Sequence, residues 1–245
     1  MNPRTAKAVL RAVFTKQMFE QLRLAAISHA KAEPGTCPAC GYHGKFGPFG
    51  MPLRTGAICP KCWSLERQRL LALAIQREEI QIVGREIVHF AGEQSVAGLI
   101  RAKGPKSYLV SEYEGDHGDL RLDIENIALP GSSLDLVIAN HVLEHINDHK
   151  ALAEVFRVLR PGGEFVCMVP LIEGWPETYE NPAIRTEVER DRHFGQFDHV
   201  RYYGADLRER IRTAGFVLRE ITAGPVDTLS HRLWRGEKIF VGLKR

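Results

Sequence analysis

The sequence has no long hydrophobic run. A membrane-spanning helix needs about 18 or more consecutive apolar residues, and no stretch of the 245 residues approaches that length. The N-terminal segment also lacks the uninterrupted apolar core of a secretory signal peptide, because Lys16 divides its longest apolar patch. These absences predict a cytoplasmic protein without a membrane span.

Net charge is almost absent as well. The chain has 33 Lys and Arg against 30 Asp and Glu. This excess is too small to predict a nucleic-acid partner, and it does not exclude one. Residues 3–31 combine helical apolar spacing with a basic face, so we expect residues 1–35 to form an N-terminal helix docked on the body. A membrane-surface, RNA-facing or transit-peptide role is the alternative.

Cysteine is scarce, and four of the five cysteines form two CxxC pairs. A secreted disulfide framework usually spreads its cysteines along a short chain, whereas clustered pairs in a long chain favour metal binding. Zinc in structural sites prefers four tetrahedral thiolates, which predicts a zinc ribbon with a structural Zn²⁺ ion over residues 36–63. Disulfides or a redox CxxC pair are the alternative. The predicted ligands are Cys37, Cys40, Cys59 and Cys62.

Short apolar strands alternate with helices from residue 84 onward. Such near-continuous apolar strands predict a mostly parallel sheet covered by helices on both faces, an α/β fold. A helix beginning at Ser64 and lying within residues 64–83 is expected to connect it to the ribbon. The expected strands cover residues 86–90, 107–111, 120–123, 134–139, 164–169, 216–221 and 238–243.

The stretch from Leu134 to Gly163 predicts a β–loop–α–β unit. Its first strand ends at Asn140, and an amphipathic helix over residues 148–159 is expected to stop at Pro161-Gly162-Gly163. In open α/β sheets, ligands bind at the carboxyl ends of the strands. The polar residues from Asn140 onward are therefore expected at a ligand site.

Several of these segments together resemble a class I S-adenosylmethionine-dependent methyltransferase of the methyltransferase type 11 kind. The matching pieces are LDLVIANHVLEHI, RVLRPGG, the LDI at Asp123 and the closing GF strand followed by a final strand. The cysteine pairs with SLERQR, and GQFDHVRYYG, resemble a bacterial branch that carries a zinc ribbon. The resemblance implies a Rossmann-like, seven-stranded sheet with the last strand antiparallel, over residues 84–245, and S-adenosylmethionine as cofactor.

The resemblance also implies where this cofactor is bound. The loop after the first strand would pass under the methionine end, although Gly92 is its only glycine where the family usually has several. Glu112 would accept hydrogen bonds from the ribose hydroxyls, and the pair after residue 122 would flank the adenine. Asn140 and its neighbour would lie near the sulfonium and the substrate. The implied cofactor-binding residues are Ala91, Gly92, Glu93, Glu112, Asp123, Ile124, Asn140 and His141.

Residues 170–204 interrupt the strand–helix rhythm with a polar, aromatic insertion. Such an insertion after a strand is expected to be a lid or substrate loop, and Thr186 with Glu189 fits a capping box within it. Methyl transfer to a hydroxyl or amine requires removal of a proton, and His199 is the preferred base because histidine titrates near neutrality. The alternative is that Asp198 and Arg201 hold the loop through ion pairs. The candidate bases are His199, His193 and Asp198, and the candidate substrate contacts are Tyr179, Arg201 and Tyr202.

Three functions follow from these patterns. The first is methyl transfer to a small molecule or glycan, expected at oxygen because the insertion mixes aromatic and polar groups. The second is an RNA base methyltransferase that uses the ribbon and the basic N-terminal helix to bind RNA. The third is a non-catalytic, cofactor-binding protein whose ribbon binds a protein partner.

Overall fold

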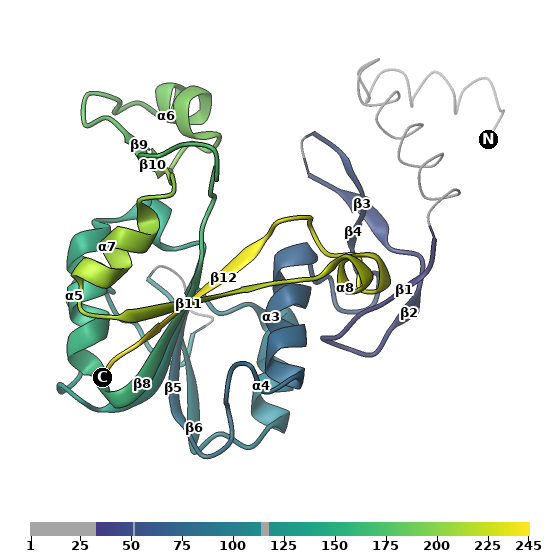
Figure 1. Ribbon diagram of the computed structural model, residues 1–245, viewed down its shortest axis with the longest axis horizontal. Coiled ribbons are helices and arrows are strands. Elements are labelled where there is room, and N and C mark those ends of the chain that lie inside the picture. Colours follow the sequence, from purple (N-terminus) through teal and green to yellow (C-terminus); the bar gives the residue numbers. More distant parts are fainter. Residues whose placement is uncertain (1–32, 51, 114–117) are drawn as a thin grey trace, which may run out of the picture. The chain divides into compact units, whose positions relative to one another are not determined.

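The structure is a computed structural model that describes residues 33–50, 52–113 and 118–245 (Figure 1). The helix expected over residues 3–31 lies outside the described residues. The chain divides into two compact units, Met1–Leu73 with Ala223–Arg235, and Ala74–Thr222 with Gly236–Arg245. Residues 223–235 thus belong to the unit that contains the cysteine pairs, although they were expected in the C-terminal domain.

The first unit is built from two short hairpins and helical segments. Helix α3 (Glu66–Gln76) begins in it after the second CxxC pair, and α8 (Pro225–Ser230) also belongs to it. Ser64 was expected to cap α3, but its hydroxyl lies 3.2 Å from Sγ of Cys62. The Leu65 N–H, just before the helix, donates to Gln68 Oε1 at 2.9 Å. In the two hairpins of the first unit, β1 (Gly35–Thr36) pairs with β2 (His43–Gly44), and β3 (Gly47–Phe49) pairs with β4 (Arg54–Ile58).

A fully buried arginine ties the segments of this first unit together. The guanidinium of Arg69 donates to the carbonyl oxygens of Ala57 at 2.9 Å, Ser64 at 2.6 Å and His231 at 2.9 Å. It also lies 4.6 Å from the ring centroid of Phe46. A buried charge is stable only when its donors find partners, so Arg69 fixes β4, the second cysteine loop and the end of α8 in one arrangement.

The second unit is a six-stranded sheet in the order β11-β12-β8-β7-β5-β6, with four parallel strands (Figure 1). β12 is antiparallel to both β8 and β11. The mostly parallel, Rossmann-like sheet expected from the sequence is therefore confirmed. Its strands are β5 (Glu86–Phe90), β6 (Ser107–Ser111), β7 (Leu134–Asn140), β8 (Leu159–Met168), β11 (Val217–Thr222) and β12 (Lys238–Leu243).

The seventh strand, expected over residues 120–123, is not formed in the described part of the chain. Leu120 makes only an isolated bridge. The reason lies in Asp119, whose carboxylate accepts the Val110 N–H at 2.9 Å, while its own N–H donates to the Val110 carbonyl at 2.8 Å. Asp119 thus occupies the Val110 N–H, and pairing with β6 is limited to the bridge at Leu120, whose N–H donates to the Val110 carbonyl at 3.1 Å.

Helical segments connect several of the strands of this sheet in sequence. α5 ends at Val158, so Pro161-Gly162-Gly163 does not stop it as expected but lies within β8. This segment is held by Lys244, whose carbonyl accepts the Gly162 N–H at 2.7 Å and whose N–H donates to the Gly163 carbonyl at 2.9 Å. The helical elements of this unit outside the insertion are α4 (Gln94–Ala102), the 3₁₀ turn η1 (Leu143–His145), α5 (Asp148–Val158) and α7 (Leu207–Thr213).

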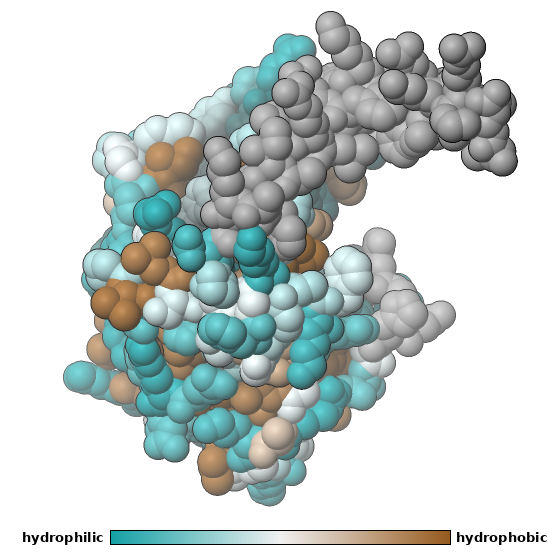
Figure 2. Space-filling view, turned by 90° about the vertical axis from the view of Figure 1, so that its right-hand side faces the viewer, coloured by the Kyte–Doolittle hydropathy of each residue, from teal (hydrophilic) through white to brown (hydrophobic). Residues whose placement is uncertain are grey.

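The hydrophobic core of the second unit is formed between the strands and helices α5 and α7. Its members include Val137, Val155, Phe165 and Ile211, all with no exposed surface. The face of the chain shown in Figure 2 is mainly hydrophilic, with hydrophobic residues in separate small groups. Among the described helices, none combines the length and hydrophobicity needed to cross a membrane.

The insertion over residues 170–204 forms a small substructure of its own. β9 (Tyr179–Glu180) pairs antiparallel with β10 (Arg201–Tyr202), and α6 (Glu187–Phe194) lies between them in sequence. The capping box expected at Thr186 and Glu189 is present at the start of α6. The insertion is therefore folded, and its two ends meet at β9 and β10.

Candidate functional site

The loop after β5 combines backbone strain with close packing. Ala91 has φ of 49°, in the left-handed region, which costs a non-glycine residue about 1–2 kcal/mol. At Gly92, an added Cβ would meet Val110 Cγ1 at 2.9 Å, so a side chain at this position would not fit without a shift. Gly92 is therefore required by its close packing against β6. The left-handed backbone conformation belongs to Ala91, the residue before it.

Glu93 turns its carboxylate toward the sheet. Its Oε2 lies 2.8 Å from Nε2 of His89, a fully buried histidine on β5. Nδ1 of His89 lies 2.9 Å from the hydroxyl of Tyr108 on β6. This buried chain of three polar groups was not foreseen from the sequence. The only signal was a histidine within an otherwise apolar strand, and the contacts join Glu93 to the protein interior.

Among the other cofactor-binding residues expected from the sequence, Glu112 follows a strand end, whereas Asp123 and Ile124 lie in the segment between β6 and β7. Glu112 directly follows β6 and is partly buried. Asp123 is exposed and accepts the Glu125 N–H at 2.8 Å, while Ile124 is buried in the core. The structure gives the position and burial of each residue, and their contacts with a cofactor stay predictions.

Asn140 and His141 lie at the carboxyl end of β7, between β5 and β8. Asn140 is 4% exposed, and neither its amide nitrogen nor its amide oxygen has a hydrogen-bond partner among the described residues. His141 has φ of 54°, and its N–H donates to the Met168 carbonyl at 2.7 Å. Two neighbouring strands of the sheet, β5 and β7, therefore each end in a non-glycine residue with left-handed backbone. Such strain is characteristic of functional sites.

Two histidines and a glutamate gather next to this strand end. Ligand atoms of Glu144, His145 and His199 all lie within 4.8 Å of one another. Glu144 is fully buried, and its Oε1 lies 3.1 Å from Nδ1 of His141. The rings of His145 and His199 pack edge to face, with centroids 4.7 Å apart. Burial lowers the pKa of His199, which favours its neutral form.

Among the candidate bases, the structure brings His199 and Asp198 into this group. Asp198 Oδ2 lies 3.2 Å from Nδ1 of His145. His193 lies instead on α6, with its Nδ1 2.7 Å from the hydroxyl of Tyr179. Glu144 and His145 belong to the polar residues after Asn140 that were expected near a ligand, but the sequence did not assign either of them a role.

Buried charges anchor the insertion beside this group. Arg201 donates through Nη1 to the carbonyl oxygens of Leu143 at 2.7 Å and Ile146 at 2.5 Å, which flank the 3₁₀ turn that carries Glu144. Arg201 also donates to Glu180 at 2.8 Å. The Glu144 carbonyl accepts the Val200 N–H at 2.9 Å. These contacts support the structural alternative for Arg201, and its expected contact with substrate stays a prediction.

Arg210 and Asp148 extend this network into the helices. Arg210 on α7 donates to Asp148 Oδ2 at 3.0 Å and to Glu180 Oε1 at 2.9 Å. The Tyr203 hydroxyl donates to the same Asp148 oxygen at 3.0 Å. Burial raises the pKa of Glu180, but the hydrogen bonds from Arg210 and Arg201 outweigh it, so this pKa lies below its usual range. The base of the insertion is thus fixed by charge-assisted hydrogen bonds.

A cavity of about 590 Å³ opens at the same place in the insertion. Tyr202 follows Arg201 on β10, and the centroid of its ring lies 6.2 Å from that of Trp175. Small-molecule sites usually have volumes of this order, although no aromatic side chain is among the lining residues of this cavity. The lining residues are Glu180, Asn181, Pro182, Ile184, Arg185, Arg190, Val200 and Arg201.

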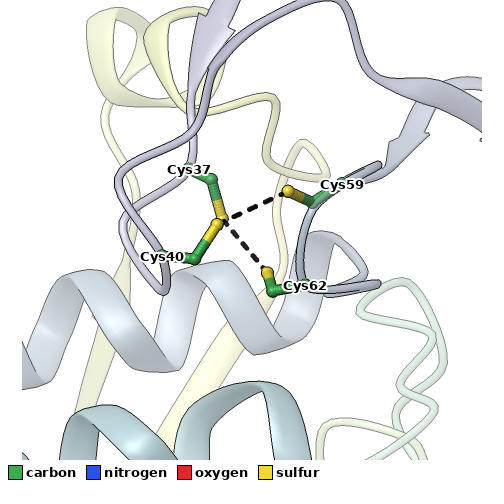
Figure 3. A group of neighbouring side chains, drawn as sticks. All are labelled: Cys37, Cys40, Cys59 and Cys62. Carbon is green, nitrogen blue, oxygen red and sulfur yellow. Dashed lines mark hydrogen bonds between the residues drawn. The ribbon is translucent and has the colours of Figure 1, made fainter.

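The four paired cysteines converge in the first unit (Figure 3). Sγ of Cys37 lies 3.7 Å from Sγ of Cys62, and Sγ of Cys40 lies 3.7 Å from Sγ of Cys59. Thiolates bound tetrahedrally to one zinc ion at 2.3 Å would be about 3.8 Å apart. No disulfide joins the described cysteines, and Cys167 is buried elsewhere, in the core of the second unit. The donor set and its spacing fit a zinc ion.

The two cysteine loops have the same backbone geometry. In the first, the Gly41 N–H donates to the Cys37 carbonyl at 2.9 Å, and in the second, the Trp63 N–H donates to the Cys59 carbonyl at 2.9 Å. The residue after each pair has positive φ, 71° at Gly41 and 62° at Trp63. Two equivalent turns thus present two sulfurs each. Ser64 adds a hydroxyl 3.3 Å from Sγ of Cys37.

Comparisons with known proteins find similarity to S-adenosylmethionine-dependent proteins. Residues 86–167 match the family model described as "Methyltransferase domain". A Mycolicibacterium smegmatis protein described as "Probable S-adenosylmethionine-dependent methyltransferase" is 28% identical over 139 residues, 56% of this chain and 46% of that protein. An S-adenosyl-L-methionine-dependent Diels-Alderase of Talaromyces variabilis is 31% identical over 100 residues, 40% of this chain and 32% of that protein. The chain therefore spans less than half the length of these curated relatives.

A solved structure agrees with the fold. The S-adenosylmethionine-dependent methyltransferase from Mesorhizobium loti superposes with a TM-score of 0.52 at 16% identity, covering 72% of this chain and 98% of that one. At this identity the likeness concerns the arrangement of strands and helices alone.

Replacing Glu180 tests the anchoring network. Glu180→Gln should lower the free energy of unfolding by about 1 kcal/mol near pH 7, because two arginines lose a charged partner. The folded pKa of Glu180 is depressed, so its contribution is present above the unfolded pKa of about 4.5 and is lost as pH falls through the folded value. The difference between wild type and variant should therefore shrink below pH 4.5, as measured by urea unfolding at several pH values.

The matched control for this experiment is Glu187→Gln, an exposed glutamate in the first turn of α6. It should change stability little at any pH. A deficit in Glu180→Gln that is constant with pH, or equal to that of the control, would show that the network does not hold the insertion.

Proposed function

We propose, on the premise that residues 86–167 form a domain of the methyltransferase family, that this chain binds S-adenosylmethionine and methylates a hydroxyl group. The acceptor is a small molecule or a glycan. The cofactor lies at the carboxyl ends of β5, β6 and β7, which end at or are followed by Ala91–Glu93, Glu112, and Asn140 with His141. Asp123 and Ile124 belong to the segment between β6 and β7 and complete the set.

The observation that carries this proposal is the state of Asn140. A buried amide without hydrogen bonds costs about 1–3 kcal/mol for each unsatisfied group, so proteins rarely retain one without a reason. Asn140 presents a donor and an acceptor that have no partner within the described ranges, at the ligand end of the sheet. A bound ligand with both kinds of polar group would satisfy them, and the amine and carboxylate of S-adenosylmethionine, or an acceptor hydroxyl, have this character.

The chemistry requires alignment of the acceptor and loss of one proton. S-adenosylmethionine, when bound, supplies a methyl group already activated on a sulfonium. The chain's own residues must then orient the acceptor and take the proton from its hydroxyl. We assign the proton removal to the group of Glu144, His145 and His199, whose ligand atoms lie within 4.8 Å of one another beside the end of β7.

The acceptor class rests on the insertion. Its cavity of about 590 Å³ is of small-molecule size, and it is lined by Val200 and Arg201, which bond directly to the segment carrying Glu144. Aromatic rings of Trp175, Tyr179 and Tyr202 lie close together nearby in the insertion. Aromatic faces combined with polar groups suit a sugar or another hydroxylated acceptor.

A structural zinc ion completes the proposal. The sulfur spacing of 3.7 Å, the matched backbone turns and the absence of disulfides among the described cysteines all support Cys37, Cys40, Cys59 and Cys62 as its ligands. With four thiolates there is no position left for substrate, so this ion stabilises the first unit and takes no part in catalysis.

Calorimetry with S-adenosylhomocysteine on two asparagine variants tests the cofactor site. Asn140→Ala should weaken binding about 10-fold or more, because a ligand loses hydrogen bonds in a buried position, while stability changes little since no internal partner is lost. Asn147→Ala is the matched control. Asn147 caps α5 by accepting the Lys150 N–H, so its loss should cost about 1 kcal/mol of stability and leave binding unchanged. Failure of the wild-type chain to bind would contradict the proposed function.

Metal content tests the zinc site. The purified wild-type chain should contain a single zinc ion by elemental analysis, and Cys59→Ala should lose it and unfold more easily. Cys167→Ala removes a cysteine that lies in the core of the second unit, and should retain zinc. Equal zinc content in both variants would show that the four paired cysteines are not the ligands.

A further inference from the structure

The group of Glu144, His145 and His199 has the composition of a metal site. It consists of one carboxylate and two imidazoles, and its ligand atoms lie within 4.8 Å of one another. Ligand atoms bound to one ion at about 2.1 Å are at most about 4.2 Å apart, so a small contraction would let all three reach a common ion. The three residues come from η1 and from the end of the insertion, so the group exists only because these segments meet.

Glu144 has an unexplained buried oxygen. Its side chain has no exposed surface, and Oε2 has no hydrogen-bond partner among the described residues. Oε1 is partnered by Nδ1 of His141, whose Nε2 is also buried without a partner in the described part of the chain. A buried carboxylate with one free oxygen is costly unless a cation or a donor satisfies it.

The two histidines are oriented as metal-ligating histidines usually are. Such residues hold one ring nitrogen on a carboxylate or a backbone carbonyl, which leaves the other nitrogen for the ion. Nδ1 of His145 lies 3.2 Å from Asp198 Oδ2, and Nδ1 of His199 lies 3.2 Å from the Phe194 carbonyl oxygen. In both residues Nε2 is then the nitrogen to offer to the ion.

The backbone around the group is held in place. The Val200 N–H donates to the Glu144 carbonyl at 2.9 Å, which ties the residue after His199 to the 3₁₀ turn. Arg201 bridges the carbonyls of Leu143 and Ile146 on either side of that turn. The ligand positions therefore rest on a rigid frame, as selective metal binding requires.

We propose that Glu144, His145 and His199 bind a divalent first-row metal ion, with His141 next to it. The mixed nitrogen and oxygen donors suit Mn²⁺ or Fe²⁺ better than Ca²⁺, which prefers oxygen ligands alone. Three protein ligands leave coordination positions open, so an acceptor oxygen can bind to the same ion.

This site would explain how the acceptor loses its proton, and to that extent it rests on the proposed function. Glu144, His145 and His199 would then assist proton removal as ligands of the ion and not as the base. A divalent cation bound there would lower the pKa of a coordinated hydroxyl by several units, so that near neutral pH its proton passes to solvent water and the oxygen becomes nucleophilic. The ion would also hold the acceptor oxygen at the end of β7, close to Asn140. The methyl acceptor would then be a molecule whose hydroxyl group can bind to a metal ion beside the insertion.

Mn²⁺ binding to the full, zinc-loaded chain tests the proposal. Mn²⁺ prefers oxygen and nitrogen donors and does not compete for the four thiolates, and its bound fraction is measured by electron paramagnetic resonance. We expect one Mn²⁺ per chain in the wild type, in addition to zinc. His199→Gln and Glu144→Gln should each weaken Mn²⁺ binding about 10-fold or more. Because Glu144 is buried and its variant can fail to fold, His145→Gln, on a partly exposed residue, gives a further measurement.

His149→Gln is the matched control, since His149 is exposed on α5 and outside the group. It should bind Mn²⁺ like the wild type. Absence of Mn²⁺ binding in the wild type, or equal binding by His199→Gln, His145→Gln and the control, would overturn the proposal. S-adenosylhomocysteine binding on the same samples separates the two claims: binding without a Mn²⁺ site removes only the metal inference, and a Mn²⁺ site without cofactor binding removes the proposed function.

Discussion

The parallel pairing of β7 between β5 and β8 is the constraint on which the candidate site depends. It brings the ends of the central strands to one edge of the sheet, and it fixes Asn140 there with its amide buried and without a hydrogen-bond partner among the residues that the structure describes. The chain must turn sharply after the strand, and His141 does so with a left-handed backbone. From this turn the next residues lead into η1, which carries Glu144 and His145. A short apolar strand thus determines where the polar chemistry lies.

The insertion is joined to this edge by charged hydrogen bonds, in addition to the hydrophobic contacts of Leu171 and Tyr203 with the core. Burying ionised groups is unfavourable unless their hydrogen-bonding capacity is met. The carboxylates of Asp148 and Glu180 form ion pairs with the guanidinium groups of Arg201 and Arg210. Arg201 also donates to the backbone carbonyls of Leu143 and Ile146. Because these bonds are directional, they set the position of His199 relative to Glu144 more sharply than apolar packing could. The base of the insertion is a fixed wall of the site.

Local patterns predicted much of this structure and missed what depends on distant partners. Strand positions, the capping box at Thr186 and the convergence of the cysteines follow from periodicity, spacing and side-chain chemistry over short distances. The missing strand at residues 120–123 depends on Asp119 capturing the backbone of Val110, which no periodicity reveals. The group around His199 joins residues more than 50 positions apart in sequence, so its members look like ordinary helix and loop residues until the fold brings them together.

The central claim is that this chain methylates a hydroxylated small molecule or glycan. The most direct measurement incubates the full chain with methyl-labelled S-adenosylmethionine and host-cell extract, and then separates RNA, protein and small-molecule or glycan fractions. Chain-dependent label in the small-molecule or glycan fraction is the predicted result. Label confined to RNA or protein, or absent from every fraction, would contradict the claim.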